Sequence, residues 1–156
     1  MEHEVVGKAK ISFVSRASFL KQWRLPKDYK KSRGDSGEDS GFSVELEIGE
    51  VKVIFWSINN VPECYPSFIW ERDEIEATST YSYVASGRTI AYMQVRGHFA
   101  TDVQKSCRNV MMLCGRILQE WQWTGVRIFK VVKYQKNLVI LSGEGQPFAY
   151  TSKPDE

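Results

Sequence analysis

The sequence predicts an α+β fold: an antiparallel sheet built from β-hairpins, with one long amphipathic helix at about 102–121 packed on one face and a short N-terminal helix. Pairs of alternating apolar segments are joined by short turns, and one later segment repeats apolar residues every three or four positions. The 156 residues are 42% hydrophobic and 26% charged, which is typical of globular proteins and excludes disordered and fibrous classes. We therefore expect a single domain over 1–156.

The N-terminal part of the chain predicts a strand, a helix and a loop. Lys8–Val14 alternates polar and apolar residues, as a half-buried strand does. Residues 16–25 are typical of a short helix, which Pro26 ends. Residues 26–41 are rich in glycine, serine and charge, so we expect a flexible charged loop there.

The clearest hairpin joins residues 42–48 to residues 51–58 through a turn at Gly49-Glu50, with glycine in the first position. This turn places apolar residues of both strands on one face, pairing Ile48 with Val51, Leu46 with Val53 and Val44 with Phe55. The second strand is apolar on both faces, so we expect it to lie in the centre of the sheet.

A second hairpin is predicted from residues 78–85 and 88–97, which meet at a turn containing Ser86-Gly87. That turn predicts two pairs of opposed residues, Tyr83 with Ile90 and Tyr81 with Tyr92. A last hairpin is expected from 126–134 and 138–142, and residues 143–156 are expected to be a tail.

The long helix is predicted between these hairpins. Thr101 is a suitable N-cap, and Gln104 completes a capping box with it. The residues expected to face the sheet step by three and four positions: Val103, Cys107, Val110, Cys114, Ile117 and Trp121.

Charge is segregated along the chain, although the net charge is only +2. Residues 1–34 carry a formal charge of +6, residues 35–77 carry −9, residues 78–136 carry +7 and the remainder carries −2. Three interpretations stay open: neutralisation within one monomer, contact between the acidic face of one copy and the basic face of the next, or binding of an anionic partner.

The anionic partner would be nucleic acid or an anionic membrane surface, because both attract the same lysines and arginines. The basic residues of the long helix and the last hairpin are the candidates for this contact: Lys105, Arg108, Arg116, Arg127, Lys130, Lys133 and Lys136. The alternative is that these charges only keep the surface of the protein soluble.

Aromatic side chains gather in three segments and are the candidates for an oligomer interface, since large rings are common interface anchors. These residues are Phe19, Trp23, Tyr65, Phe68, Trp70, Trp121 and Trp123. The alternative is that they cover the core of the monomer.

The sequence shows no catalytic, metal or cofactor motif, so we expect no enzyme activity, no metal and no cofactor. His98 with a nearby carboxylate is the one enzymatic alternative. Cys64, Cys107 and Cys114 include no CxxC pair and are expected to be buried free thiols. Met1-Glu2-His3-Glu4 does not begin a secretory signal, so we expect an intracellular protein.

Taken together, these features predict a non-enzymatic, self-associating structural or assembly protein, matrix-like or scaffold-like and of a kind that includes viral proteins. Its partner would be a second copy of itself, and its basic face would meet an anionic partner. The alternative function is a sequence-tolerant RNA- or DNA-binding module that uses the same basic helix and hairpin. No small-molecule substrate is expected.

Overall fold

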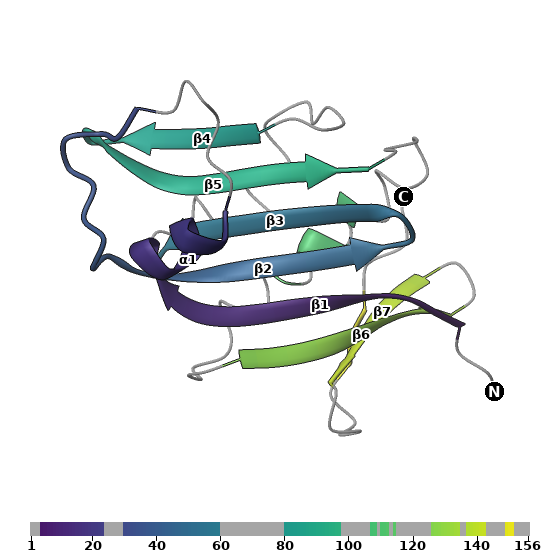
Figure 1. Ribbon diagram of the computed structural model, residues 1–156. Coiled ribbons are helices and arrows are strands. Elements are labelled where there is room, and N and C mark those ends of the chain that lie inside the picture. The colour runs from purple at the N-terminus through teal and green to yellow at the C-terminus, as the bar shows by residue number, and fades with distance from the viewer. Residues whose placement is uncertain are drawn as a thin grey trace.

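A computed structural model of the chain describes residues 4–23, 30–59, 80–97, 107–108, 110–112, 114, 126–134, 137–142 and 149–151. These residues form one eight-stranded sheet in the order β4-β5-β3-β2-β1-β6-β7-β8, in which every neighbouring pair is antiparallel (Figure 1). The elements are β1 (Glu4–Ser15), α1 (Arg16–Gln22), β2 (Ser40–Ile48), β3 (Val51–Ile58), β4 (Thr80–Ala85), β5 (Arg88–Arg96), β6 (Val126–Tyr134), β7 (Asn137–Ser142) and β8 (Ala149–Thr151).

The α+β class with a long amphipathic helix is wrong, because the fold is mostly an antiparallel sheet. Within 102–121, the described residues Cys107–Arg108, Val110–Met112 and Cys114 are helical, and the others lie outside the described residues. In the described part of the chain, helix is limited to this short segment and the seven-residue α1. The apolar residues spaced three and four apart therefore correctly indicated a buried helical face. The fold nevertheless contains much less helix than we expected.

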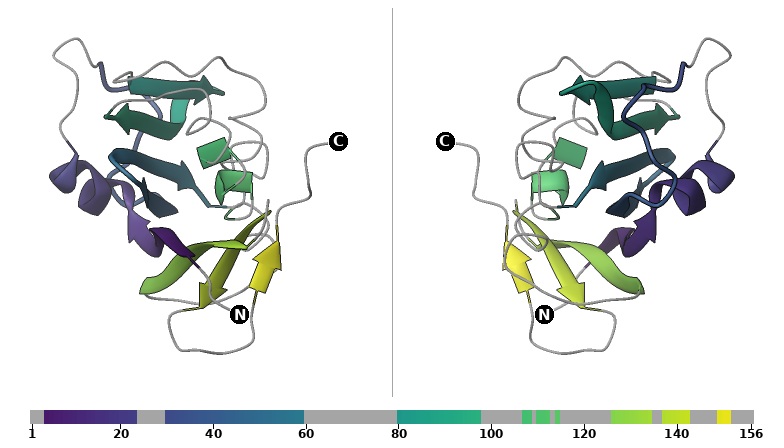
Figure 2. Two further views of the ribbon diagram at one scale, coloured as in Figure 1. Left: turned by 90° about the vertical axis from the view of Figure 1, so that its right-hand side faces the viewer. Right: turned by 90° about the vertical axis from the view of Figure 1, so that its left-hand side faces the viewer.

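The two faces of the sheet are covered by different elements. Seen edge-on, α1 lies on one side of the sheet and the described helical residues between 107 and 114 lie on the other (Figure 2). On the second side, Cys107, Val110, Met111 and Cys114 pack with a large apolar cluster from β1, β2, β3, β5 and β6. A smaller cluster lies under α1 and contains Phe19, Trp23, Trp56, Ile58 and Tyr92. We call this side the α1-bearing face.

The β2–β3 hairpin is confirmed together with its register. Ile48 lies opposite Val51, Leu46 opposite Val53 and Val44 opposite Phe55. Gly49 has a φ of 58°, as the expected glycine-first turn requires. β3 is central, because Phe55 and Trp56 point to opposite faces and are both fully buried.

The β4–β5 hairpin turns where expected but pairs differently. Tyr83 lies opposite Ala91 and not Ile90, because a β-bulge interrupts the register between Tyr83 and Val84. One added residue shifts the pairing, so Tyr81 and Tyr83 pack against the large cluster while Tyr92 belongs to the cluster under α1.

The C-terminal segment contains a strand that we did not expect. Residues 149–151 form β8, within the segment that we expected to be a tail. Cys107 and Cys114 are buried free thiols, and burial raises the pKa of each to about 12; Cys64 lies outside the described residues. No helix in the part of the chain described above is long and apolar enough to cross a membrane.

Candidate functional site

The short helix α1 is defined by its two ends. The Ser15 side chain caps its first turn and accepts a hydrogen bond of 3.2 Å from the backbone N–H of Ser18. At the other end, Trp23 is extended, and its backbone N–H donates to the carbonyl of Phe19. These ends fix which side chains α1 presents to the sheet.

Aromatic rings attach α1 to β3 and β5. The ring centroids of Phe19 and Trp23 lie 4.7 Å apart, and each ring also contacts Tyr92, at 5.9 and 5.5 Å. Phe19 lies 6.1 Å from Trp56. Offset and edge-to-face contacts at these distances are favourable, so the rings hold the helix in a fixed position.

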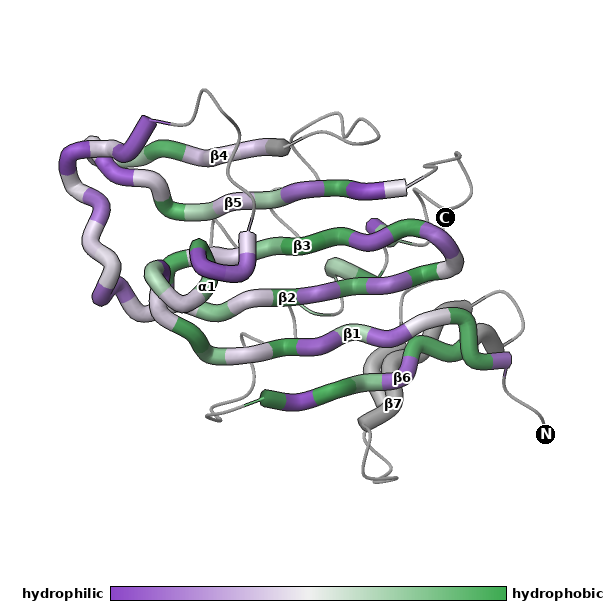
Figure 3. The backbone as a smooth tube through the Cα atoms, viewed as in Figure 1, coloured by the Kyte–Doolittle hydropathy of each residue, from purple (hydrophilic) through white to green (hydrophobic). Residues whose placement is uncertain are grey.

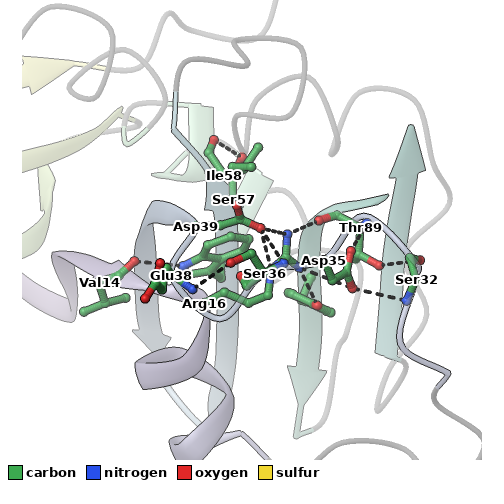
Figure 4. Close-up of polar contacts among 12 residues, drawn as sticks. Val14, Arg16, Ser32, Asp35, Ser36, Glu38, Asp39, Ser57, Ile58 and Thr89 are labelled. Carbon is green, nitrogen blue, oxygen red and sulfur yellow. Dashed lines mark hydrogen bonds and ion pairs between the residues drawn. The ribbon is translucent and has the colours of Figure 1, made fainter. Parts of the chain in front are cut away.

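Arg16, the first residue of α1, is the centre of a buried polar network (Figure 4). It is only 2% exposed. Its Nη1 donates to the hydroxyl of Tyr92 at 2.7 Å, and its Nη2 donates to the carbonyl of Thr89 at 2.6 Å. Nε and Nη2 both donate to Oδ2 of Asp39, at 3.1 and 3.0 Å. The guanidinium also lies 4.9 Å from the ring centroid of Trp56, where a cation–π attraction adds to the hydrogen bonds.

Asp35 is the second carboxylate of this network. Its Oδ2 lies 3.7 Å from Nη1 of Arg16, and its Oδ1 accepts a hydrogen bond of 2.7 Å from the backbone N–H of Thr89. Close by, the backbone N–H of Gly34 donates to the carbonyl of Gly87. This part of the segment 26–41 is therefore bonded to β5 and the β4–β5 turn. The flexibility expected for the whole segment stays a prediction, and residues 24–29 lie outside the described part of the chain.

The pKa of Asp39 reflects two opposing effects, burial and hydrogen bonding to charged and polar groups. Burial by itself raises the pKa of this carboxyl group. The backbone N–H of Ser36 and the guanidinium of Arg16 outweigh that effect, and together they lower the pKa below its ordinary value of 3.8. Asp39 is therefore a charged partner of Arg16 at neutral pH.

Beyond α1, the α1-bearing face carries rows of charged residues that no described element covers. β1 contributes Lys8 and Lys10, β2 contributes Glu45 and Glu47, and β3 contributes Lys52. Nζ of Lys8 lies 3.5 Å from Glu47, which also lies 3.9 Å from Nζ of Lys52. Polar and apolar residues alternate along these strands (Figure 3). We call this region the open half of the face.

A groove of about 140 Å³ lies where the open half meets α1. Its polar lining includes Lys10 and Ser12 from β1 and Ser43 and Glu45 from β2. Its apolar lining comes from α1 and from the strands, and includes Val14, Phe19, Trp23, Ile54 and Val126. The groove thus combines both signs of charge, hydroxyl groups and an apolar wall.

The strand β6 adds exposed apolar residues to the open half. Val126 lies opposite Ser12 and Ile128 lies opposite Lys10, so both project from the α1-bearing face. Val126 is 57% exposed and Ile128 is 54% exposed. Two branched apolar side chains therefore lie side by side next to the groove.

The predicted basic residues that the structure describes do not gather on one face. Lys130 lies opposite Lys8, whereas Arg127 lies opposite Ile11, so their side chains project from opposite faces. Arg108 is exposed on the helical segment across the sheet from α1, and Lys133 lies in β6. The other three predicted residues, Lys105, Arg116 and Lys136, lie outside the described residues.

Of the aromatic residues predicted at an oligomer interface, the structure describes Phe19 and Trp23. They are 5% and 6% exposed and pack within the chain, which corresponds to the alternative that they cover the core. The other five, Tyr65, Phe68, Trp70, Trp121 and Trp123, lie outside the described residues, as does His98.

Sequence patterns did not point to the residues that shape this site, above all Arg16, Asp35, Ser12 and Ser43. Among the described residues, no group of three histidine, cysteine or acidic side chains is placed to hold a metal ion. Comparison with family models, with curated proteins and with solved structures finds no match.

Proposed function

We propose that the protein is a non-enzymatic assembly protein that self-associates through the open half of the α1-bearing face. The observation that carries this proposal is the exposure of Val126 and Ile128 next to charged rows of both signs. Adjacent apolar side chains with a polar surround are typical of protein–protein contact sites.

The order of the charges suits a second copy of the same chain. Across the sheet, the basic row of β1 is followed by the acidic row of β2 and then by Lys52 of β3. In a two-fold dimer, the same surface must be complementary to itself. Rotating one copy until its basic row faces the acidic row of the other meets that condition.

The same order of charges is less suited to nucleic acid or to an anionic membrane. Glu45 and Glu47 lie between the lysines of β1 and Lys52, so a phosphate approaching this face would meet carboxylates as well as lysines. Binding of an anionic partner by the basic residues stays a prediction, to be distinguished from self-association in one experiment.

That experiment is light-scattering mass after size exclusion, at several protein concentrations and at low and high salt, with absorbance recorded at 260 and 280 nm. We expect the mass to rise with concentration and to fall in high salt, without excess absorbance at 260 nm. A monomer at every concentration would contradict the proposal, and a monomer with salt-sensitive absorbance at 260 nm would favour nucleic acid.

A matched pair of variants tests the surface itself. Ile128→Asp places a charge among the exposed apolar residues of β6 and should give a monomer. Val84→Asp is the control, because Val84 is 61% exposed and lies near the β4–β5 turn, away from the open half. If both variants keep the mass of the original chain, self-association does not use this face.

A further inference from the structure

The groove beside α1 is set apart by two opposite charges that do not pair. Lys8 and Glu47 form an ion pair of 3.5 Å across β1 and β2. Two residues further along the same pair of strands, Lys10 lies opposite Glu45, and both line the groove. Neither forms an ion pair with any residue that the structure describes. The groove therefore presents a free ammonium and a free carboxylate from neighbouring strands.

Two serine hydroxyl groups lie next to these charges. Ser12 and Ser43 are opposite each other on β1 and β2, are 5% and 9% exposed, and both line the groove. Neither hydroxyl makes a hydrogen bond to another described residue. Each hydroxyl oxygen keeps contact with solvent in the groove, so both can donate to or accept from a molecule bound there.

The remaining wall of the groove is apolar. Phe19 of α1 and Trp23, the residue after α1, line it together with Ile54 and Val126 of the sheet. The indole N–H of Trp23 is buried without an acceptor in the described part of the chain. The Arg16 network holds α1 against the sheet, so this wall keeps its position when the groove is empty.

We infer that this groove binds a free α-amino acid with an apolar side chain. Its carboxylate would meet Lys10, its ammonium would meet Glu45, and its side chain would lie against the apolar wall. A ligand with a single charge would be attracted by one of these two residues and repelled by the other, which carries the same charge as the ligand. The volume suits the apolar side chain of such a ligand, because a closed cavity of about 150 Å³ holds benzene, which is larger than an isobutyl group.

The inference does not rest on self-association, and the experiment keeps the two apart. The probe is L-leucine, titrated into ¹⁵N-labelled Ile128→Ser protein and observed by NMR. Ile128 does not line the groove but lies opposite Lys10, so the neutral serine removes the exposed apolar side chain without placing a carboxylate beside the Lys10 ammonium. We expect saturable shifts at Ser12, Ser43 and the indole N–H of Trp23, with a dissociation constant of about 1 mM. In the original chain a second copy would compete for Lys10 and Glu45, so the same signals should move at higher concentrations of L-leucine.

Changes to the ligand and the protein test the charge pairing. N-acetyl-L-leucine lacks the ammonium and L-leucinamide lacks the carboxylate, and each should bind roughly tenfold more weakly. Lys10→Gln and Glu45→Gln should each weaken the binding of L-leucine by a similar factor. Lys8→Gln and Glu47→Gln are the controls, since these residues lie on the same strands but do not line the groove.

Several results would overturn the inference. One is the absence of saturable shifts with L-leucine in a protein whose spectrum shows that it is folded. Another is equal binding of the capped and free amino acids, because the paired charges would then not be used. A third is equal weakening by the Lys8→Gln control and by Lys10→Gln, which would indicate a general charge effect.

Discussion

The two halves of the α1-bearing face contain the same kinds of charged groups in opposite environments. At the α1 end, Arg16 is 2% exposed and bonds to Asp39, Tyr92 and Thr89. In the open half, the side chain of Lys8 is 61% exposed and that of its partner Glu47 is 42% exposed. The first set of charges is enclosed by protein, and the second remains in water.

This difference assigns different roles to the two halves. A buried ion pair is costly to break, because removing one partner leaves the other charge buried and uncompensated. An exposed pair contributes little to stability, since water and salt screen it and both side chains lose freedom. The α1 end therefore holds the fold together, and the charges of the open half are available for contacts with other molecules.

The largest expected effect follows from removing the central charge of the buried network. Arg16→Met keeps most of the side-chain length but removes the guanidinium that faces the buried carboxylate of Asp35, so we expect a loss of about 3–5 kcal/mol in the free energy of unfolding. Urea denaturation measures the loss. Lys21→Met is the control, because it removes an exposed charge from the same helix. Equal losses in the two variants would mean that the network does not hold α1.

A smaller effect is expected from a single hydrogen bond of the same network. Tyr92→Phe keeps the ring between Phe19 and Trp23 but removes the acceptor that lies 2.7 Å from Nη1 of Arg16. We expect a loss of about 1.5–3 kcal/mol in urea denaturation, which is the range for hydrogen bonds to charged groups. An unchanged stability would show that another acceptor replaces the hydroxyl.

Acid should weaken the α1 end through Asp39. The pKa of this carboxyl group is lower in the folded chain than its ordinary value of 3.8. Its stabilising effect is therefore complete above the ordinary pKa and is lost as the pH falls through the folded pKa. Asp39→Asn should flatten the loss of stability below about pH 4 in thermal melts, and Glu38→Gln on the same loop should leave it unchanged. If the original chain and both variants lost stability in parallel as the pH falls, the effect would not belong to Asp39.

The contrast between hairpins shows what sequence patterns determine. The β2–β3 register could be predicted, because a two-residue turn leaves one register that gathers Val44, Leu46 and Ile48 on one face. The β4–β5 register could not, because the bulge opposite Tyr83 and Val84 adds Ile90 to β5 without a recognisable sequence signal. The fold class was wrong for a different reason: periodicity locates a buried helical face but does not show how much of the core the sheet supplies.

The candidate site was harder to predict, because it depends on strands that are distant in sequence. Ser12 meets Ser43 and Lys10 meets Glu45 only through the pairing of β1 with β2, and α1 and a loop lie between those strands. Asp35 lies in a segment whose composition is typical of a solvated loop, and only the folded chain places it against Arg16. Local patterns predict elements, whereas this site arises from their non-local pairing.

The smallest effects are expected in the open half, where they sharpen the contrast with Arg16. Lys8→Gln and Glu47→Gln should each change the free energy of unfolding by less than about 1 kcal/mol, because water competes for both groups. A double-mutant cycle in urea isolates the coupling between them, and this coupling should shrink further as salt is added. A coupling as large as the loss in Arg16→Met would mean that the open half is covered in solution. In that case its charges would belong to the core of the fold and would not be free to contact a second copy of the chain.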